Sequence, residues 1–506
     1  MKKFILNPSL NNVSVFLLLI FPASLVIGPF VAEVVMNLIN IFFLIKTLKS
    51  KKFTFLKDKF FIFFILFYFY IFITIIFSNY VDKILFKHIF YFRHIIFVFA
   101  IVDLLKINER LILKFYKFLS ITILIVCIDG IFQFIFDYNL LGFPQIRPDR
   151  LTGFFGDKMI LGSYVARFLP LLLGLFIYNF KFLNKKYYLL GCGILIISFL
   201  TIILSGERMA FISTLIYLIC VFILLNFAKK IKILLIFTVL SMVTIIISFS
   251  PTLLDRHFQQ TIDQVNFKFN TKDIFSNFNS YSNIYKTSYN GFLNKKIIGQ
   301  GARSFRYFCS EKHLESFSNS KLVLNPKTNQ FQNPNIKYLI IDIHFEQYEM
   351  IKKDKILFTY LNKEKEKIDY VSHFDGQVFS SNLFSLQNKH IYPSSIWWEV
   401  KILKNGCTTH PHNFYLQLIS ETGFVGFVFL SILFGYLVFL ICKNFMAMVY
   451  LKKRSNYTNY QICLLLGFVI TLLPISPNGN FFNNWLSMVM FLPVGFYIHS
   501  IKIYTK

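Results

Sequence analysis

The sequence KFFIFFILFYFYIFITIIFS occupies residues 59–78 and carries a single charge, at Lys59. An α-helix rises about 1.5 Å per residue, so about 20 apolar residues cross the roughly 30 Å of hydrocarbon in a bilayer. The whole chain shares this character, with 55% hydrophobic residues, 15% charged residues and a mean hydropathy of +0.57. It is too apolar for an ordinary soluble globule, and we predict an integral membrane protein.

Similar apolar runs recur along the chain and indicate about twelve membrane spans. They lie at residues 13–30, 31–48, 59–78, 85–105, 114–136, 158–180, 187–205, 208–226, 231–250, 414–442, 459–475 and 483–502. The first and second runs, and the seventh and eighth, are so closely spaced that each pair could also form one helix. The first run lacks a small-residue cleavage site, so we expect a span there and no cleavable signal peptide. These runs predict an all-α polytopic membrane protein.

Lysine and arginine gather in alternate connections, and this predicts the orientation of the chain. Basic clusters at 46–59, 106–117, 181–186, 229–232 and 443–454 fall on one side together with both termini. Because basic connections stay in the cytoplasm, we expect the N-terminus inside. The net charge of +28 then reflects topology and contact with anionic lipids, and we expect no nucleic-acid partner.

One long polar segment separates the ninth and tenth runs, and we expect it to form a large domain on the outer face. It divides the chain into a transmembrane bundle at 1–250, a loop domain at 251–409 and a second bundle at 410–506. The domain should have mixed α/β character, because 280–296 has helical apolar spacing and 338–348 alternates apolar with polar residues as a strand does.

The same segment offers residues for a metal site and for a disulfide. Asp342, His344 and Glu346 would share one face of the predicted strand, but we favour a solvated polar face over a metal site and expect no metal. Cys309 and Cys407 lie outside the apolar runs. They could form a disulfide in an oxidising compartment or remain two unrelated thiols.

Residues 408–426, TTHPHNFYLQLISETGFVG, place two histidines where the polar segment returns to the membrane. An imidazole titrates near pH 6.5 and can accept a proton from a hydroxyl, so His412 is the natural general base. Asn413 can cap a helix that begins at Phe414. A carboxylate inside an apolar run is costly, so Glu421 is either functional or paired with an arginine.

The glycines that follow, Gly423 and Gly426, allow close contact between helices. Two further ionisable residues lie inside apolar runs, and Arg93 could pair with Asp129 there.

Arginines collect on the same predicted face as His412. Arg208 lies in a short outer connection, where it either serves a partner or snorkels to the interface. Further guanidinium groups belong to Arg147, Arg150, Arg303 and Arg306. Guanidinium forks match phosphate oxygens, so this face suggests an anionic lipid diphosphate as ligand. A bond between Cys309 and Cys407 would bring Arg306 and His412 into one neighbourhood, although it could equally serve only to pin the domain.

The sequence resembles the O-antigen ligase and polymerase superfamily of bacterial envelope glycan enzymes. The motifs that carry the resemblance are His412-Asn413 followed by Gly423-x-x-Gly426; Gly299-x-Gly301 with Ser304-Phe305-Arg306 and Cys309; Ser205 to Ala210; and Ser476 to Phe482. They span roughly residues 150–490, and the rest of the chain agrees only in its number of spans.

The resemblance implies transfer of a glycan from undecaprenyl diphosphate to an acceptor hydroxyl, such as that of lipid A–core, at the periplasmic face of the inner membrane. It implies no nucleotide, metal or other cofactor. Arg208 and His412 match the family's arginine before the large loop and its essential histidine. The family's second arginine falls near Tyr281 here, so Arg303 or Arg306 should substitute.

Our hypothesis is that His412 takes the proton of the acceptor hydroxyl while arginines stabilise the departing diphosphate. The catalytic residues would be His412, Arg208 and Arg306, and the substrate-binding residues Arg303, Arg150, His410, Asn413 and Glu421. The rival enzymes are a polymerase, whose acceptor is another carrier-linked glycan, and a ligase that acts on protein, and the sequence hardly separates them. A polysaccharide exporter would instead show interrupted helices and a polar path through the middle of the membrane.

Overall fold

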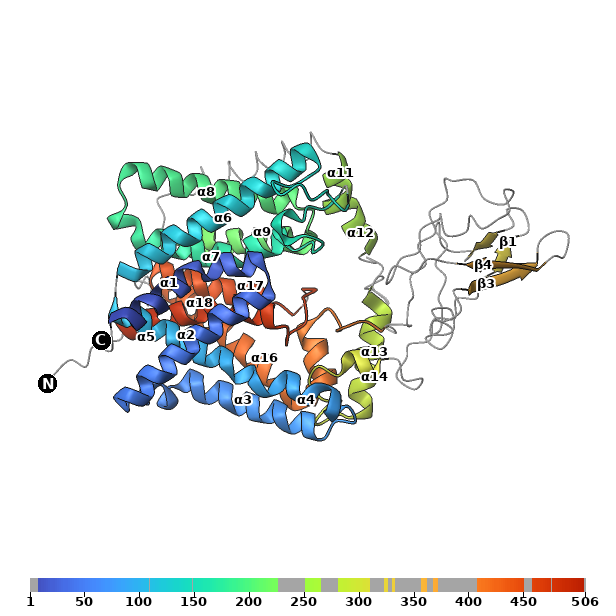
Figure 1. Cartoon of the computed structure of the whole chain (residues 1–506), viewed down its shortest axis with the longest axis horizontal. Coiled ribbons are helices and arrows are strands. Elements are labelled where there is room, and N and C mark those ends of the chain that lie inside the picture. The colour runs from blue at the N-terminus through green and yellow to red at the C-terminus, as the bar shows by residue number, and fades with distance from the viewer. Residues whose placement is uncertain are drawn as a thin grey trace.

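The computed structural model shows a bundle of long helices with smaller elements gathered at one end (Figure 1). It describes residues 8–108, 110–147, 149–225, 251–264, 281–309, 323–325, 330–332, 356–361, 367–371, 407–449, 457–474 and 476–504. The predicted span at 231–250 and the predicted strand at 338–348, with Asp342, His344 and Glu346, lie outside the described residues.

Nine helical segments in the described part are long and apolar enough to cross a membrane. They are α1 (Pro8–Ile27), α2 (Pro29–Ser50), α3 (Lys59–Ile76), α4 (Val81–Ile89) continued through η2 (Phe90–Phe92) into α5 (Arg93–Ile107), α6 (Arg110–Phe136), α7 (Leu161–Asn179), α8 (Lys185–Leu204), α16 (Phe414–Val449) and α18 (Asn484–Tyr504). Two shorter apolar helices are α9 (Arg208–Leu224) and α17 (Asn459–Thr471).

The chain is therefore an all-α polytopic membrane protein, as the hydropathy predicts. Every predicted apolar run other than 231–250 corresponds to one of these helices. Both closely spaced pairs are separate helices, α1 beside α2 and α8 before α9. Local signals set some of the boundaries: Asp58 caps α3, and Thr458 with Gln461 forms a capping box at the start of α17.

The helices pack so that segments far apart in sequence share one core. α5 packs against α18 and α7 packs against α17, while α1 lies along α2. The start of α1 and the end of α18 lie at one end of the bundle, and the segments before α7, α9 and α16 lie at the other, which we call the loop end (Figure 1).

Between α9 and α16 the structure describes short helices and two small hairpins. The helical elements are α11 (Pro251–Leu254), the π-helical η5 (Asp255–Gln259), α12 (Gln260–Gln264), α13 (Ser282–Asn294) and α14 (Phe305–Phe308). Strand β1 (Val323–Asn325) pairs antiparallel with β2 (Gln330–Gln332), and β3 (Ile356–Leu361) pairs antiparallel with β4 (Lys367–Val371). The helix predicted at 280–296 corresponds to α13.

Helix α16 is interrupted two turns after it begins. Gly423 has a φ of 66° and a ψ of −169°, which is not helical, so α16 consists of two helical pieces. The loop before α14 fills the break: the N–H groups of Gln300 and Gly301 donate to the carbonyl oxygens of Ser420 and Glu421 at 2.9 and 2.7 Å. Backbone groups freed within a membrane helix need such replacement partners.

This break corrects the prediction that Gly423 serves contact between helices. A Cβ at Gly423 would collide with the carbonyl oxygen of Ile297, so the close neighbour is loop backbone. Glycine also adopts the positive φ without steric cost.

The predicted pair of Arg93 with Asp129 is wrong. Arg93 begins α5, which packs against α2, and its guanidinium lies 3.2 Å from the carboxylate of Glu33. Asp129 instead accepts a hydrogen bond from the N–H of Leu140 at 2.9 Å, because it faces the loop that follows α6.

Candidate functional site

His412 lies in a short segment held at both ends. Upstream, Cys407 forms a disulfide with Cys309 across 98 residues of sequence, with the two Cα atoms 4.9 Å apart. Downstream, the side-chain oxygen of Asn413 accepts from the N–H groups of Tyr415 and Leu416 at 2.9 and 3.0 Å and caps α16, as predicted. The segment is therefore tied to α14 on one side and to α16 on the other.

The backbone of His412 is also fixed by the loop before α18. Its φ is 57°, and its carbonyl oxygen accepts from the N–H of Asn478 at 2.8 Å. The Asn413 amide nitrogen donates to the carbonyl oxygen of Pro474 at 2.6 Å, so both ends of that amide are engaged within the protein. A non-glycine residue with positive φ is uncommon and persists where its surroundings hold it.

Aromatic groups flank the His412 ring. The ring centroid of His410 lies 4.2 Å from that of His412, and the ring of Tyr281 lies 5.6 Å away on α13's N-terminal side. The ring of His410 has a polar neighbour next to it in sequence: Thr409 Oγ1 lies 2.9 Å from its Nδ1.

Burial acts on the pKa of both histidines. It lowers the pKa of His412 below the ordinary value of about 6.5, because a charged imidazolium loses hydration there. The pKa of His410 falls further, to about 3, because burial adds to repulsion by His412 and Arg306. Both rings are therefore neutral at neutral pH, and a neutral ring nitrogen can accept a proton.

Glu421 fastens the turn that carries the loop arginines. Its side chain is fully buried and accepts from the N–H groups of Arg303 and Phe305 at 2.9 and 3.0 Å. The Gln417 side chain donates a third hydrogen bond at 3.0 Å. Glu421 thus accepts from two backbone N–H groups and a glutamine side chain, and the predicted arginine neighbour is Arg303, whose guanidinium attracts it electrostatically.

Arg303 and Arg306 differ in their surroundings, although they are neighbours in sequence. The Arg303 guanidinium donates to the carbonyl oxygen of Phe482 and to the Asn484 side chain, at 3.2 Å for the latter. Arg306 lies within electrostatic range of His410 and Arg303. Of the two, Arg306 is the one that acts electrostatically on His410.

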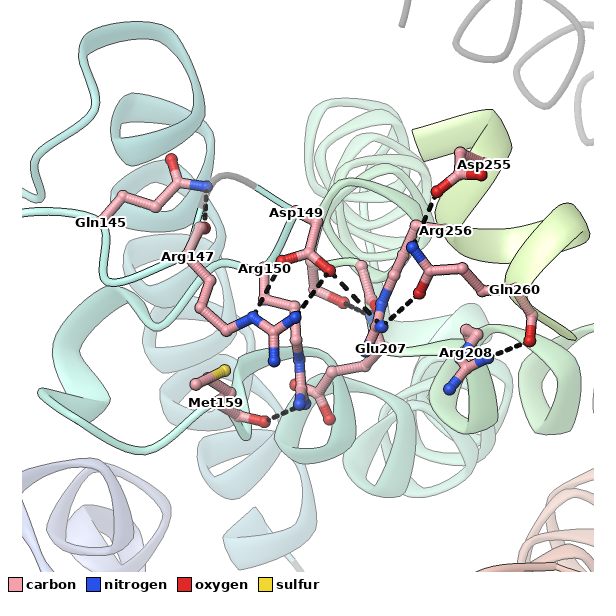
Figure 2. A network of polar contacts seen from close by, with 12 residues as sticks. Gln145, Arg147, Asp149, Arg150, Met159, Glu207, Arg208, Asp255, Arg256 and Gln260 are labelled. Carbon is pink, nitrogen blue, oxygen red and sulfur yellow. Dashed lines mark hydrogen bonds and ion pairs between the residues drawn. The ribbon is translucent and has the colours of Figure 1, made fainter. Parts of the chain in front are cut away.

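A second group of arginines lies where α9 begins, and Figure 2 shows it from close by. We call it the arginine cluster; it comprises Arg147, Arg150, Arg208 and Arg256. Asp149 lies between two members and pairs with Arg147 at 3.1 Å and with Arg256 at 3.4 Å. Three members reach backbone carbonyl oxygens: Arg208 donates to Gln260 at 2.9 Å, Arg150 to Met159 at 2.9 Å and Arg256 to Gly206 at 3.1 Å.

The cluster holds more positive than negative charge. The buried carboxylate of Glu207 attracts Arg150 electrostatically, and it accepts from the N–H groups of Gly162 and Ser163 and from the Ser163 hydroxyl. Its oxygens are thus occupied by neutral donors. Four guanidinium groups that repel one another in this way favour a multiply charged anion between them.

Tyr281 lies near both groups of residues. It lies within electrostatic range of Arg208, and its ring contacts that of His412.

The structure sorts the predicted residues into two sets. His412, His410, Asn413, Arg306, Glu421 and the disulfide lie together, whereas Arg208 and Arg150 lie in the arginine cluster. Sequence reasoning missed Arg256, which follows Pro251 at the beginning of the long polar segment. An arginine so close to the membrane boundary was the available signal. In the described ranges no group of three or more His, Cys, Asp or Glu is arranged to hold a metal.

Comparison with known proteins gives one family match. Residues 193–339 match the family model Wzy_C, described as O-Antigen ligase. The range includes Arg208, Arg256 and the turn with Arg303 and Arg306, and it ends before His412. None of the curated proteins matches the chain.

Proposed function

We propose that this chain, whose membership of the O-antigen ligase superfamily is supported by the match over residues 193–339, transfers a glycan from undecaprenyl diphosphate to an acceptor hydroxyl. The family match indicates a glycan ligase or polymerase, and the many apolar helices indicate a multi-pass membrane enzyme with lipid-linked substrates. In this proposal the loop end faces the periplasm, the chain resides in the inner membrane, and residues 251–409 form the periplasmic domain.

His412 is the proposed general base. It takes the proton from the acceptor hydroxyl as that oxygen attacks the anomeric carbon of the carrier-linked glycan. The bond between this carbon and the diphosphate oxygen breaks, and the electron pair leaves with the diphosphate. A single displacement of this kind inverts the anomeric centre. The ring of His412 is suited to the role because burial keeps it neutral and its backbone is fixed.

The arginine cluster is the proposed site of the departing diphosphate. Arg208, Arg150 and Arg256 are each held by a backbone carbonyl oxygen, and preorganised donors of this kind lower the barrier most where negative charge grows. Arg306 is proposed to act from the side of the histidines. Arg303 and Glu421 hold the turn, and Asn413 holds the start of α16. No metal or nucleotide takes part in the proposed reaction.

The observation that carries this proposal is that Tyr281 lies near both Arg208 and His412. It brings a neutral base and a cationic site to the same end of the bundle from segments far apart in sequence. The test is transfer of a lipid-linked glycan by the purified protein in vesicles. We expect His412→Ala to lower the rate about a hundredfold or more while the protein remains folded.

The acceptor separates the ligase from the polymerase. Cells that lack the gene should carry lipid A–core without polymer and should accumulate long carrier-linked chains if the protein is a ligase. Single repeat units on the core would indicate a polymerase. Full rescue by His412→Ala would overturn the proposed base.

An exporter remains the alternative from another class, and the interruption of α16 is the feature it shares with transporters. The backbone of Gln300 and Gly301 occupies that break, so the break does not line a path for substrate. Glycan movement across vesicles without any new glycosidic bond would favour the exporter.

A further inference from the structure

Glu33 is a carboxylate within a membrane helix that the proposed reaction does not use. It lies one turn after the beginning of α2, and each of its oxygens has a different partner. Oε1 accepts from the side-chain amide of Asn484 at 2.6 Å, and Oε2 lies 3.2 Å from the guanidinium of Arg93. The partners come from different helices, because α2 packs against both α5 and α18. Charged side chains within membrane helices are costly, and those that occur are paired or functional.

The groups on either side of Asn484 fix the orientation of its amide. The amide nitrogen donates to Glu33, and the amide oxygen accepts from the guanidinium of Arg303 at 3.2 Å. A carboxylate can only accept and a guanidinium can only donate, so this orientation is the one that satisfies both neighbours. Arg93, Glu33, Asn484 and Arg303 thus form a continuous row of polar side chains, which we call the polar chain.

The polar chain ends at the backbone segments that hold the candidate site. The turn that begins with Arg303 continues to Arg306, one of the proposed catalytic residues. The guanidinium of Arg303 also donates to the carbonyl oxygen of Phe482, in the loop before α18. In the same loop the N–H of Asn478 donates to the carbonyl oxygen of His412 at 2.8 Å. A change at α2 therefore has a route of direct contacts to both sides of the site.

We propose that Glu33 is a positioning residue, which fixes the orientation of the Arg303 guanidinium through Asn484. That guanidinium joins the turn that carries Arg306 to the loop that holds His412. Glu33 acts through these residues and does not itself touch substrate. Correct placement of reacting groups contributes large factors to rate, so a small displacement of the turn lowers it. The inference rests on the proposed function in one respect, that Arg306 and His412 act on the substrate.

Glu33→Gln tests the polarity of the chain. An amide at position 33 has one accepting and one donating end, so it presents a donor either to Arg93 or to the donating nitrogen of Asn484. If the Asn484 amide turns over, the conflict moves to Arg303. We expect the turn to loosen, so that the N–H groups of residues 303 and 305 exchange about tenfold faster. The measurement is hydrogen-exchange mass spectrometry on the full-length protein in detergent.

The kinetics of glycan transfer provide a second measurement. Glu33→Gln should lower kcat about tenfold or more, because the groups at the site are misplaced. The KM for the lipid-linked donor should stay close to that of wild type, since the polar chain does not include the arginine cluster. Unchanged exchange at the turn together with an unchanged kcat would overturn the proposal.

A double variant, Glu33→Gln with Asn484→Asp, should restore the chain with its polarity shifted by one residue. The new amide at position 33 accepts from Arg93 and donates to the new carboxylate at position 484, which also accepts from Arg303. Asn484→Asp alone sets two carboxylates face to face and should be harmful. We expect the double variant to recover most of kcat and the slow exchange of the turn. A double variant no better than Glu33→Gln, in folding or in these measurements, would overturn the proposal.

The same two helices offer a matched control. Nearer the C-terminal ends of α2 and α5, Lys46 pairs with Asp103. The side chains of this pair and of Glu33 with Arg93 are all between 19% and 31% exposed, so both pairs can join α2 to α5 equally well. Asp103→Asn should leave kcat and the exchange of the turn unchanged. Equal effects of Asp103→Asn and Glu33→Gln would mean that Glu33 merely joins the two helices, and the proposal would fail.

Hydrogen exchange separates this inference from the proposed function, because it needs no glycosyl transfer. If wild type forms no glycosidic bond, but Glu33→Gln loosens the turn and the double variant tightens it again, the function is refuted and the positioning by Glu33 stands. If wild type transfers glycan and Glu33→Gln alters neither exchange nor kcat, the function stands and the positioning is refuted.

Discussion

The carboxylate of Glu421 accepts a hydrogen bond from the N–H of Arg303 at 2.9 Å, across 118 residues of sequence. A second bond, from the N–H of Phe305, completes a buried attachment of the loop to the broken helix α16. The turn next to the histidines is thus held from within the membrane bundle. Changes at Glu421 should therefore act on the site through the turn.

Removal of this carboxylate should disrupt both stability and activity. Glu421→Ala leaves two buried N–H groups without partners, and each such loss costs about 1–3 kcal/mol. Glu421→Gln keeps an acceptor oxygen and should be milder. The measurements are thermal unfolding in detergent and glycan transfer. Asp103→Asn, which breaks a partly exposed ion pair with Lys46, serves as control and should change stability by about 1 kcal/mol or less. Equal effects of Glu421→Ala and Asp103→Asn would contradict the attachment.

The pH dependence of transfer should report the burial of His412. A base must be neutral, so activity falls as the pH drops through the pKa of the folded protein, which burial places below 6.5. We expect the midpoint of the acid limb of kcat/KM below pH 6.5. His410 should not contribute, because its pKa of about 3 keeps it neutral throughout this range. We expect His410→Ala to leave the acid limb unchanged. A midpoint above pH 6.5 in wild type would contradict the assignment of the acid limb to a buried His412.

Arg256 should matter as much as Arg208 for binding of the donor. Its side chain is 11% exposed and bridges Asp149 and the carbonyl oxygen of Gly206, whereas that of Arg147 is 51% exposed. We expect Arg256→Gln to lower kcat/KM about tenfold or more, in line with a charge-assisted hydrogen bond of roughly 1.5–3 kcal/mol. Arg147→Gln, the exposed comparison, should have a smaller effect. The opposite order would place the diphosphate elsewhere.

The interruption of α16 can be tested with two glycines of the same helix. Gly423→Ala introduces a collision with the Ile297 carbonyl oxygen at a positive φ, and we expect a loss of about 1–3 kcal/mol of stability together with lower activity. A Cβ at Gly435 would have no heavy atom within 4 Å, and the φ of Gly435 is not positive. Gly435→Ala should therefore be neutral or stabilise by up to about 1 kcal/mol. Thermal unfolding distinguishes the two, and a harmless Gly423→Ala would mean that α16 is continuous.

The disulfide should support the histidine segment. Cys309→Ser with Cys407→Ser removes a cross-link that spans 98 residues and should lower stability by about 2–4 kcal/mol. A reducing agent should lower the activity of wild type and leave that of the double variant unchanged. The free cysteine Cys192 in α8 provides the control, since Cys192→Ser should retain the response to reduction. Insensitivity of wild type to reduction would argue against a structural bond.

The membrane class and the helices could be predicted from sequence, because the length of an apolar run and the capping of a helix depend on neighbouring residues. The run at 59–78 predicted α3, and Asn413 predicted the start of α16. The resemblance that His412 and Arg208 suggested agrees with the family match over 193–339. Neither the partner of Arg93 nor the role of Gly423 could be found in this way, because each depends on which distant segment lies opposite.

Sequence alone thus established a polytopic membrane protein with histidines and arginines gathered at one end, since periodicity and charge bias are local properties of the chain. Three-dimensional packing added the arrangement of these groups. It set Arg256 beside Asp149 and brought Tyr281 near both Arg208 and His412. Such contacts join residues tens to hundreds of positions apart, and only the packing of whole helices determines which of them meet.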